Sequence, residues 1–223
     1  MIYTISNIKE DIKTLSAKQF YIKYLLRSDN WYFENILDYH NNDLIHAIDD
    51  FKCIISDNLK INLNCISMVG SGKIGYSLAP IEEKLYRQFN NDEQQGKLSD
   101  LDIAIVSSEL FNKYWYLLRH SFSPVYSAYY KYIPTEIYRG YINEKYLSNI
   151  PNCRKEWIAQ SSASKKALTA NLFIKHQITY RLYRNWEDVE HYHIQSIVQI
   201  QNNKLKTYIN PQNHGGCANG INV

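Results

Sequence analysis

The sequence predicts an α/β protein of the α+β type, in which N- and C-terminal helices flank a small mixed sheet. Three short apolar runs predict the strands, at residues 65–69, 102–106 and 177–184. The segments around these runs repeat apolar residues at spacings of three and four, which is the helical period. Because neither an internal repeat nor a linker divides the chain, we expect residues 1–206 to form one domain.

The chain before the first strand is expected to be a helical extension. Residues 7–27 are polar with an apolar stripe at helical spacing, which predicts an amphipathic helix. Asn42 or Asp43 can cap a second helix, which runs to about Asp57 and leads into the first strand. The apolar residues of this second helix are Leu44, Ile45, Ile48, Phe51, Ile54 and Ile55.

The region between the second and third strands is expected to combine helices with an irregular segment. Ser108 can cap a helix that runs to about His120. Residues 121–152 contain Pro124, Pro134 and Pro151 among many tyrosines, and this composition predicts irregular structure. A helix is predicted again from Trp157 to Phe173.

The chain after the third strand is expected to end in a helix and a tail. Residues 186–200 return to helical spacing. Residues 207–223 are rich in Asn and Gly and lack an apolar face, so we expect a flexible tail there.

Composition limits the class of protein. A net charge of +3 and a pI of about 8.5 do not require a nucleic-acid partner. No signal peptide is visible, and no apolar run reaches the ~18 residues of a membrane span, so we expect a cytoplasmic protein without membrane contact. The cysteines show neither metal-site spacing nor a disulfide framework, as expected in a reduced cytosol: Cys53, Cys65, Cys153 and Cys217.

Two carboxylates, Asp100 and Asp102, stand at the start of the second strand. Strand side chains alternate, so both point to the same face. Burying such like charges together costs several kcal/mol unless a cation compensates them. Carboxylate oxygens suit Mg²⁺, which commonly accompanies nucleotide phosphates, so the pair predicts a Mg²⁺ (or Mn²⁺) site. The alternative is a solvated strand end or an Asx turn.

A glycine-rich loop, Gly70-Ser71-Gly72-Lys73-Ile74-Gly75, follows the first strand. A hydroxyl beside glycine N–H groups suits a phosphate cradle, so Ser71 is a candidate ligand and Lys73 is a second one in the same loop. A plain glycine turn is the alternative.

Two other phosphate-binding motifs fit this loop poorly. The glycines satisfy G-x-G-x-x-G, but Pro80 disfavours the long helix that the dinucleotide fingerprint needs, and its acid should follow a strand rather than open one. A Walker A loop would require Gly in place of Ser67 and Ser or Thr in place of Ile74.

A strand ending in Gly-Ser, followed by a strand opening with Asp-x-Asp, resembles the nucleotidyltransferase superfamily, which includes polymerase β-like enzymes and small bacterial nucleotidyltransferases. The motifs span about residues 65–106. The resemblance implies a sheet of the nucleotidyltransferase type, in which Gly70 and Ser71 hold the triphosphate of an NTP and Asp100 and Asp102 are catalytic metal ligands. Residues 180–200 are also similar to uncharacterised bacterial proteins of this superfamily.

The chain departs from the superfamily pattern at two places. A polar insert at residues 90–96 lengthens the connection between the two motifs. Members also usually have a third carboxylate on a later strand, whereas residues 177–184 contain none. The candidates for this third acid are Glu136, Glu187, Asp188 and Glu190.

The resemblance implies a metal-dependent nucleotidyltransferase that moves an NMP from an NTP to a hydroxyl acceptor, on RNA, a protein or a small molecule. The alternative is a catalytically impaired nucleotide-binding or interaction module of the same fold. A third hypothesis is a helical ribonuclease, from the spacing of Arg184 and His191. Further phosphate-binding candidates are Arg181, Arg184, Lys165 and Lys166.

Overall fold

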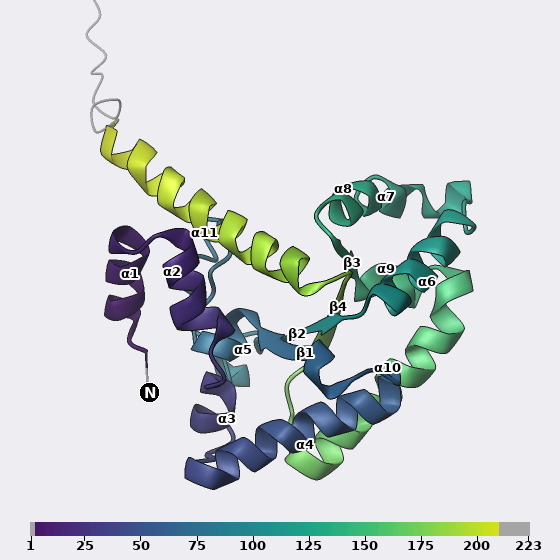
Figure 1. Ribbon diagram of the computed structural model, residues 1–223, viewed down its shortest axis with the longest axis horizontal. Coiled ribbons are helices and arrows are strands. Elements are labelled where there is room, and N and C mark those ends of the chain that lie inside the picture. Colours follow the sequence, from purple (N-terminus) through teal and green to yellow (C-terminus); the bar gives the residue numbers. More distant parts are fainter. Residues whose placement is uncertain (1–2, 210–223) are drawn as a thin grey trace, which may run out of the picture.

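The computed structural model, which describes residues 3–209, shows a four-stranded mixed sheet with helices on both faces (Figure 1). The strand order is β1-β2-β4-β3, with β2 and β4 parallel and the two outer pairs antiparallel. The strands are β1 (Ile66–Val69), β2 (Leu101–Val106), β3 (Tyr141–Asn143) and β4 (Ile178–Tyr183). The predicted α+β class and the three predicted strands are therefore confirmed.

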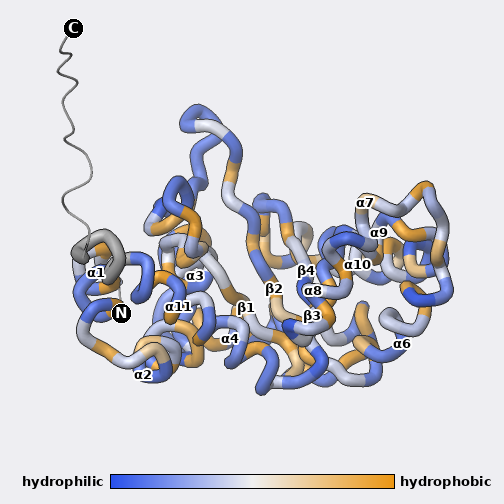
Figure 2. Tube along the Cα trace, turned by 90° about the horizontal axis from the view of Figure 1, so that it is seen from above, coloured by the Kyte–Doolittle hydropathy of each residue, from blue (hydrophilic) through white to orange (hydrophobic). Residues whose placement is uncertain are grey.

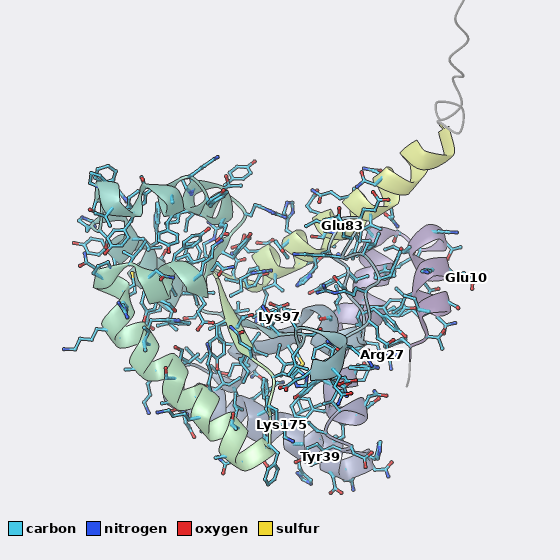
Figure 3. All side chains as sticks on the ribbon, turned by 180° about the vertical axis from the view of Figure 1, so that it is seen from behind. Glu10, Arg27, Tyr39, Glu83, Lys97 and Lys175 are labelled. Atoms are coloured by element: carbon cyan, nitrogen blue, oxygen red, sulfur yellow. The ribbon has the colours of Figure 1, made fainter. Side chains whose placement is uncertain are left out.

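The main core lies on the face of the sheet that is opposite to Asp102. Alternate residues of the strands, such as Ile103, Ile105 and Leu182, are buried there. Figure 3 shows the side chains that fill the space between this face and its helices. The helices of this layer are α4 (Asn41–Leu59), α6 (Ser108–Arg119), α9 (Glu144–Asn149) and α10 (Pro151–Leu172).

The other face of the sheet is covered by the long helix α11 (Trp186–Ile209), against which the N-terminal helices pack (Figure 1). Val189 of α11 packs on the sheet, while Ile197 and Ile200 pack on the N-terminal helices. These are α1 (Ile5–Thr14), α2 (Ala17–Tyr21) and the π-helical turn η1 (Ile22–Leu26).

The expected helix over residues 7–27 is divided in two. Leu15 is extended, and the hydroxyl of Ser16 accepts a hydrogen bond from the N–H of Gln19. Together with the Gln19 side chain this forms a capping box, which starts α2 in a new direction. The caps of two later helices also differ from the prediction, since His40 precedes α4 and Ser107 caps α6.

The prediction of irregular structure over residues 121–152 was wrong. This segment forms β3 and several short helices, and it ends with the first two residues of α10. Pro124, Pro134 and Pro151 all stand in the first turn of a helix, where the missing N–H has no intrahelical partner to lose. The prolines therefore mark helix starts here.

The remaining short elements include α3, which was not predicted. They are α3 (Trp31–Asn35), η2 (Leu63–Cys65), α5 (Gly70–Ile74), η3 (Glu93–Gln95), η4 (Pro124–Tyr126), α7 (Ser127–Tyr130) and α8 (Ile133–Tyr138). Figure 2 shows hydrophobic residues along the strands and hydrophilic ones along the outer loops.

Helix α11 runs to Ile209, past the expected domain boundary at residue 206. The rest of the expected tail, residues 210–223, lies outside the described residues. Among the helices of residues 3–209, none combines the length and the apolarity of a transmembrane segment.

Candidate functional site

The antiparallel pairing of β1 and β2 brings the glycine loop to the aspartates. Val69, the last residue of β1, pairs with Asp102 near the start of β2. Gly70 comes next, with a φ of +68°, and a Cβ on it would lie 2.7 Å from Oδ2 of Asp102. Only glycine fits both the left-handed backbone and this close approach. Loop and carboxylate therefore share one site.

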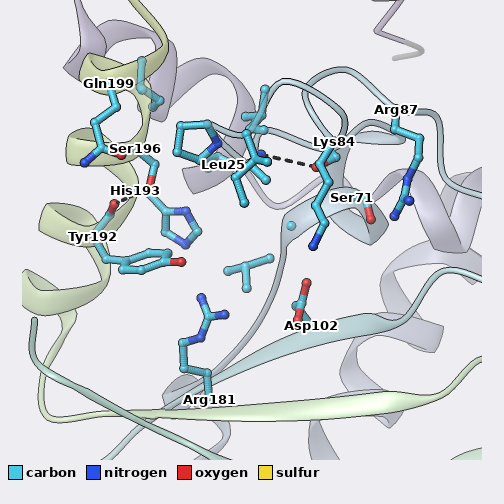
Figure 4. A pocket seen from close by; sticks show the side chains of 18 of the residues that line it. Leu25, Ser71, Lys84, Arg87, Asp102, Arg181, Tyr192, His193, Ser196 and Gln199 are labelled. Carbon is cyan, nitrogen blue, oxygen red and sulfur yellow. Dashed lines mark hydrogen bonds between the residues drawn. The ribbon is translucent and has the colours of Figure 1, made fainter. Parts of the chain in front are cut away.

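This site opens into a cavity of about 470 Å³. Four of the five predicted site residues line it: Gly70, Ser71, Asp100 and Asp102. Figure 4 shows the side chains of Ser71 and Asp102 within this cavity. The volume is in the range of small-molecule sites, which is about 300–1,000 Å³.

Asp102 accepts a hydrogen bond from Thr179 and is repelled by the like charge of Asp100. Its Oδ1 accepts a hydrogen bond of 2.9 Å from Oγ1 of Thr179, its partner in the β2–β4 register. Burial raises the pKa of the Asp102 carboxyl, against the opposing effects of Arg181 and Thr179, and Asp100 raises it further. A bound cation would relieve both the desolvation and the repulsion between the two carboxylates.

Lys73 does not reach the cavity, and this corrects its prediction as a phosphate ligand. The loop continues as the helical turn α5, so Ser71 and Lys73 project in different directions. Lys73 is buried, and its ammonium group donates hydrogen bonds to the carbonyl oxygens of Arg27 and Asp29. Burial lowers its pKa to about 8. Lys73 therefore anchors the segment before α3.

We expect Lys73→Met to destabilise the protein without weakening nucleotide binding. The substitution leaves the two carbonyl groups without their donor, which costs about 1–3 kcal/mol for a buried polar group. Urea unfolding of Lys73→Met and of the exposed control Lys97→Met measures the difference in the free energy of unfolding. A loss of nucleotide affinity at unchanged stability would contradict this structural role and would indicate that Lys73 binds the nucleotide.

The connection between α5 and β2 forms a wall of the cavity, which sequence reasoning missed. It folds back on itself through hydrogen bonds from the N–H of Ser77 to the carbonyl of Arg87 and from the N–H of Tyr86 to that of Ser77. This brings Lys84 and Arg87 to the cavity (Figure 4). The sequence signal that could have identified Lys84 and Arg87 was their positive charge, close in the chain to a candidate phosphate-binding loop.

The opposite wall comes from β4 and α11. Arg181, predicted as one phosphate-binding candidate, lines the cavity together with Tyr192, His193 and Ser196 of α11 (Figure 4). The other basic candidates are engaged or exposed elsewhere: Lys165 pairs with Glu144 at 2.6 Å, Lys166 is exposed, and Arg184 binds Asp188.

None of the four candidate third acids is among the described residues that line this cavity. Asp188 makes two 2.9 Å hydrogen bonds with Arg184, and Glu190 lies 3.4 Å from Lys18. Glu187 is exposed, whereas Glu136 accepts a hydrogen bond from Tyr146 and its pKa is raised by burial. Within residues 3–209, no three His, Cys, Asp or Glu side chains are grouped as a metal site.

The dinucleotide-binding motif disagrees with the structure. A dinucleotide fingerprint needs parallel strands joined by a helix, but β1 and β2 are antiparallel and α5 ends after one turn. Gly75 is the left-handed cap of that turn and packs against Trp31. Of the two residues in the ribonuclease pattern, Arg184 makes hydrogen bonds to Asp188, and His191 is exposed on α11.

Comparisons with protein-family models, with curated proteins and with solved structures give no match to this chain.

Proposed function

We propose that this protein is a metal-dependent nucleotidyltransferase, which binds an NTP and transfers its NMP group to a hydroxyl acceptor. The observation that carries the proposal is the contact between Gly70 and Asp102 at the cavity. It unites a glycine-serine loop, suited to phosphates, with two carboxylates suited to a divalent cation. Lys84 and Arg87 on the adjacent wall add positive charge for a triphosphate.

Each residue has a role in this reaction. Asp100 and Asp102 would hold Mg²⁺ (or Mn²⁺), and when bound the ion neutralises phosphate charge and favours ionisation of the acceptor hydroxyl. Gly70 and Ser71 orient the triphosphate through backbone N–H and hydroxyl groups. Thr179 fixes the orientation of Asp102. The acceptor oxygen forms a bond to the α-phosphorus as the bond to the bridging oxygen breaks, pyrophosphate leaves, and the hydroxyl proton passes to solvent.

A second candidate function is nucleotide binding without transfer, in an interaction module of the same fold. The observation that favours it is the position of the four candidate third acids, none of which lines the cavity. Two carboxylates neutralise a pair of metal ions less completely than three do.

Incubation with each labelled NTP and Mg²⁺ separates these functions. Transfer predicts release of pyrophosphate and label on RNA, protein or a small molecule, whereas binding alone predicts neither. Under both functions, calorimetry should detect binding of a non-hydrolysable NTP that EDTA removes. Equal affinity with and without EDTA would contradict the metal site.

A further inference from the structure

The wall formed by β4 and α11 presents buried polar atoms without partners. Among the described residues, Nε of Arg181 and Nε2 of His193 are enclosed and lack a hydrogen bond. Both residues line the cavity and point into it in Figure 4, and His193 is only 9% exposed. An unpaired buried group of this kind costs about 1–3 kcal/mol, and a ligand that pairs with it recovers that cost.

The charge of Arg181 is only partly compensated. The one hydrogen bond that its side chain makes to a described residue is a long one of 3.4 Å to the hydroxyl of Tyr183, and no described carboxylate lies within ion-pair distance. Asp102 and Glu136 act on it from farther away. The guanidinium carbons of Arg181 and Arg139 lie 4.9 and 4.8 Å from the centre of the Tyr192 ring. Two guanidinium groups around one ring favour an anionic ligand.

His193 adds a neutral hydrogen-bonding group to this wall. Burial and the charge of Arg181 lower its pKa to about 3, so its imidazole is uncharged at neutral pH. A neutral imidazole offers Nε2 as one donor or acceptor, depending on its tautomer. Arg139 and Arg181 therefore give this wall two positive charges beside a neutral imidazole.

The strand order places this wall on the far side of Asp102 from the glycine loop. Gly70 approaches Asp102 from the β1 side, whereas Arg181 stands on β4, and β2 lies between them. In a phosphoryl transfer, the attacking and leaving oxygens are roughly in line on opposite sides of the phosphorus. With the triphosphate at Gly70 and Ser71, the acceptor enters from the side of Arg181.

We infer that Arg181, assisted by Arg139 and His193, binds a phosphate of the acceptor, so that the acceptor is a nucleotide, either free or at the end of an RNA. This inference depends on the proposed nucleotidyl transfer. A serine, threonine or tyrosine hydroxyl of a protein has no fixed anion beside it, and a cationic small molecule would be repelled by the two guanidinium groups. A nucleotide has both a free hydroxyl and a neighbouring phosphate.

The test is calorimetry in EDTA, with no NTP present. The probes are the common ribonucleoside 5′-monophosphates, the corresponding nucleosides, and dinucleoside monophosphates as minimal RNA ends. We expect at least one phosphate-bearing probe to bind about 10-fold or more tightly than its nucleoside, equivalent to about 1.4 kcal/mol. Arg181→Met should remove that difference, whereas Arg154→Met, an exposed control on α10, should not change it. Binding of only one class of probe identifies the free nucleotide or the RNA end as the source.

Two further variants assign the phosphate to its side of the cavity. Arg87→Met, on the opposite wall, should weaken Mg²⁺–NTP binding and leave monophosphate binding unchanged. Arg181→Lys keeps the charge without the planar donor fork, and should retain only part of the phosphate preference. Circular dichroism checks that both Arg181 variants fold.

Three outcomes would overturn the inference. The first is equal affinity for nucleotides and nucleosides, and the second is a phosphate preference that survives in both Arg181 variants. The third is monophosphate binding that depends on Arg87 instead of Arg181. Mg²⁺–NTP binding by the wild type is measured separately. Its absence beside Arg181-dependent phosphate binding would overturn the transfer reaction, and with it the assignment of that phosphate to an acceptor.

Discussion

Asp102→Asn is expected to weaken Mg²⁺-dependent NTP binding by on the order of 100-fold, or about 2.7 kcal/mol. The amide keeps an oxygen that can accept the hydrogen bond from Thr179, but it removes the charge that would hold the cation. Calorimetry with a non-hydrolysable NTP measures the loss. Asp57→Asn, an exposed aspartate on α4, is the matched control. Full affinity in Asp102→Asn would contradict the proposed site.

The same variant is expected to fold at least as stably as the wild type at neutral pH. The pKa of Asp102 is raised in the folded state, so the folded protein binds this proton more tightly than the unfolded chain does. The wild type therefore loses stability as pH rises from the unfolded pKa through the folded pKa, and the asparagine variant lacks this loss. Urea unfolding across this pH range checks the sign. The same raised pKa predicts that, as pH is lowered, Asp102 becomes protonated at a higher pH than an exposed aspartate does. The NTP affinity of the wild type should therefore begin to decrease at that higher pH.

Gly70→Ala is expected to remove nucleotide binding and to destabilise the fold. The left-handed backbone alone costs a non-glycine residue about 1–2 kcal/mol, and the new methyl group would lie 2.7 Å from the Asp102 carboxylate. Gly96→Ala is the matched control, because Gly96 also has a positive φ, but a Cβ there meets no atom within 4 Å.

Thermal unfolding and Mg²⁺–NTP calorimetry together distinguish the two glycine variants. Both should lower Tm through backbone strain, but only Gly70→Ala should lose the nucleotide. Retention of wild-type affinity in Gly70→Ala would show that close approach of the loop to Asp102 is not required for binding.

The strands and the paired aspartates could be predicted because they depend on local pattern. Alternation along residues 101–106 places Asp102 on one face and Leu101, Ile103 and Ile105 on the buried other face, whatever the strand neighbours are. The short β3, of three residues, has no such pattern of its own. It forms because Tyr141–Asn143 pairs with β4. The periodicity of a short segment contains no information about a pairing partner about 40 residues away in the chain.

Short-range spacing in the sequence was enough to predict the α+β class, the three longer strands and the residue types of the proposed phosphate and cation site. Which of those residues meet depends on contacts between segments that are far apart in the chain. The antiparallel register of β1 and β2 joins Gly70 to Asp102, while the helical turn after Gly70 carries Lys73 away to the carbonyls of Arg27 and Asp29. The second wall arises because α11 crosses the sheet and brings His193 beside Arg181. Such convergence depends on long-range packing, which no local pattern encodes.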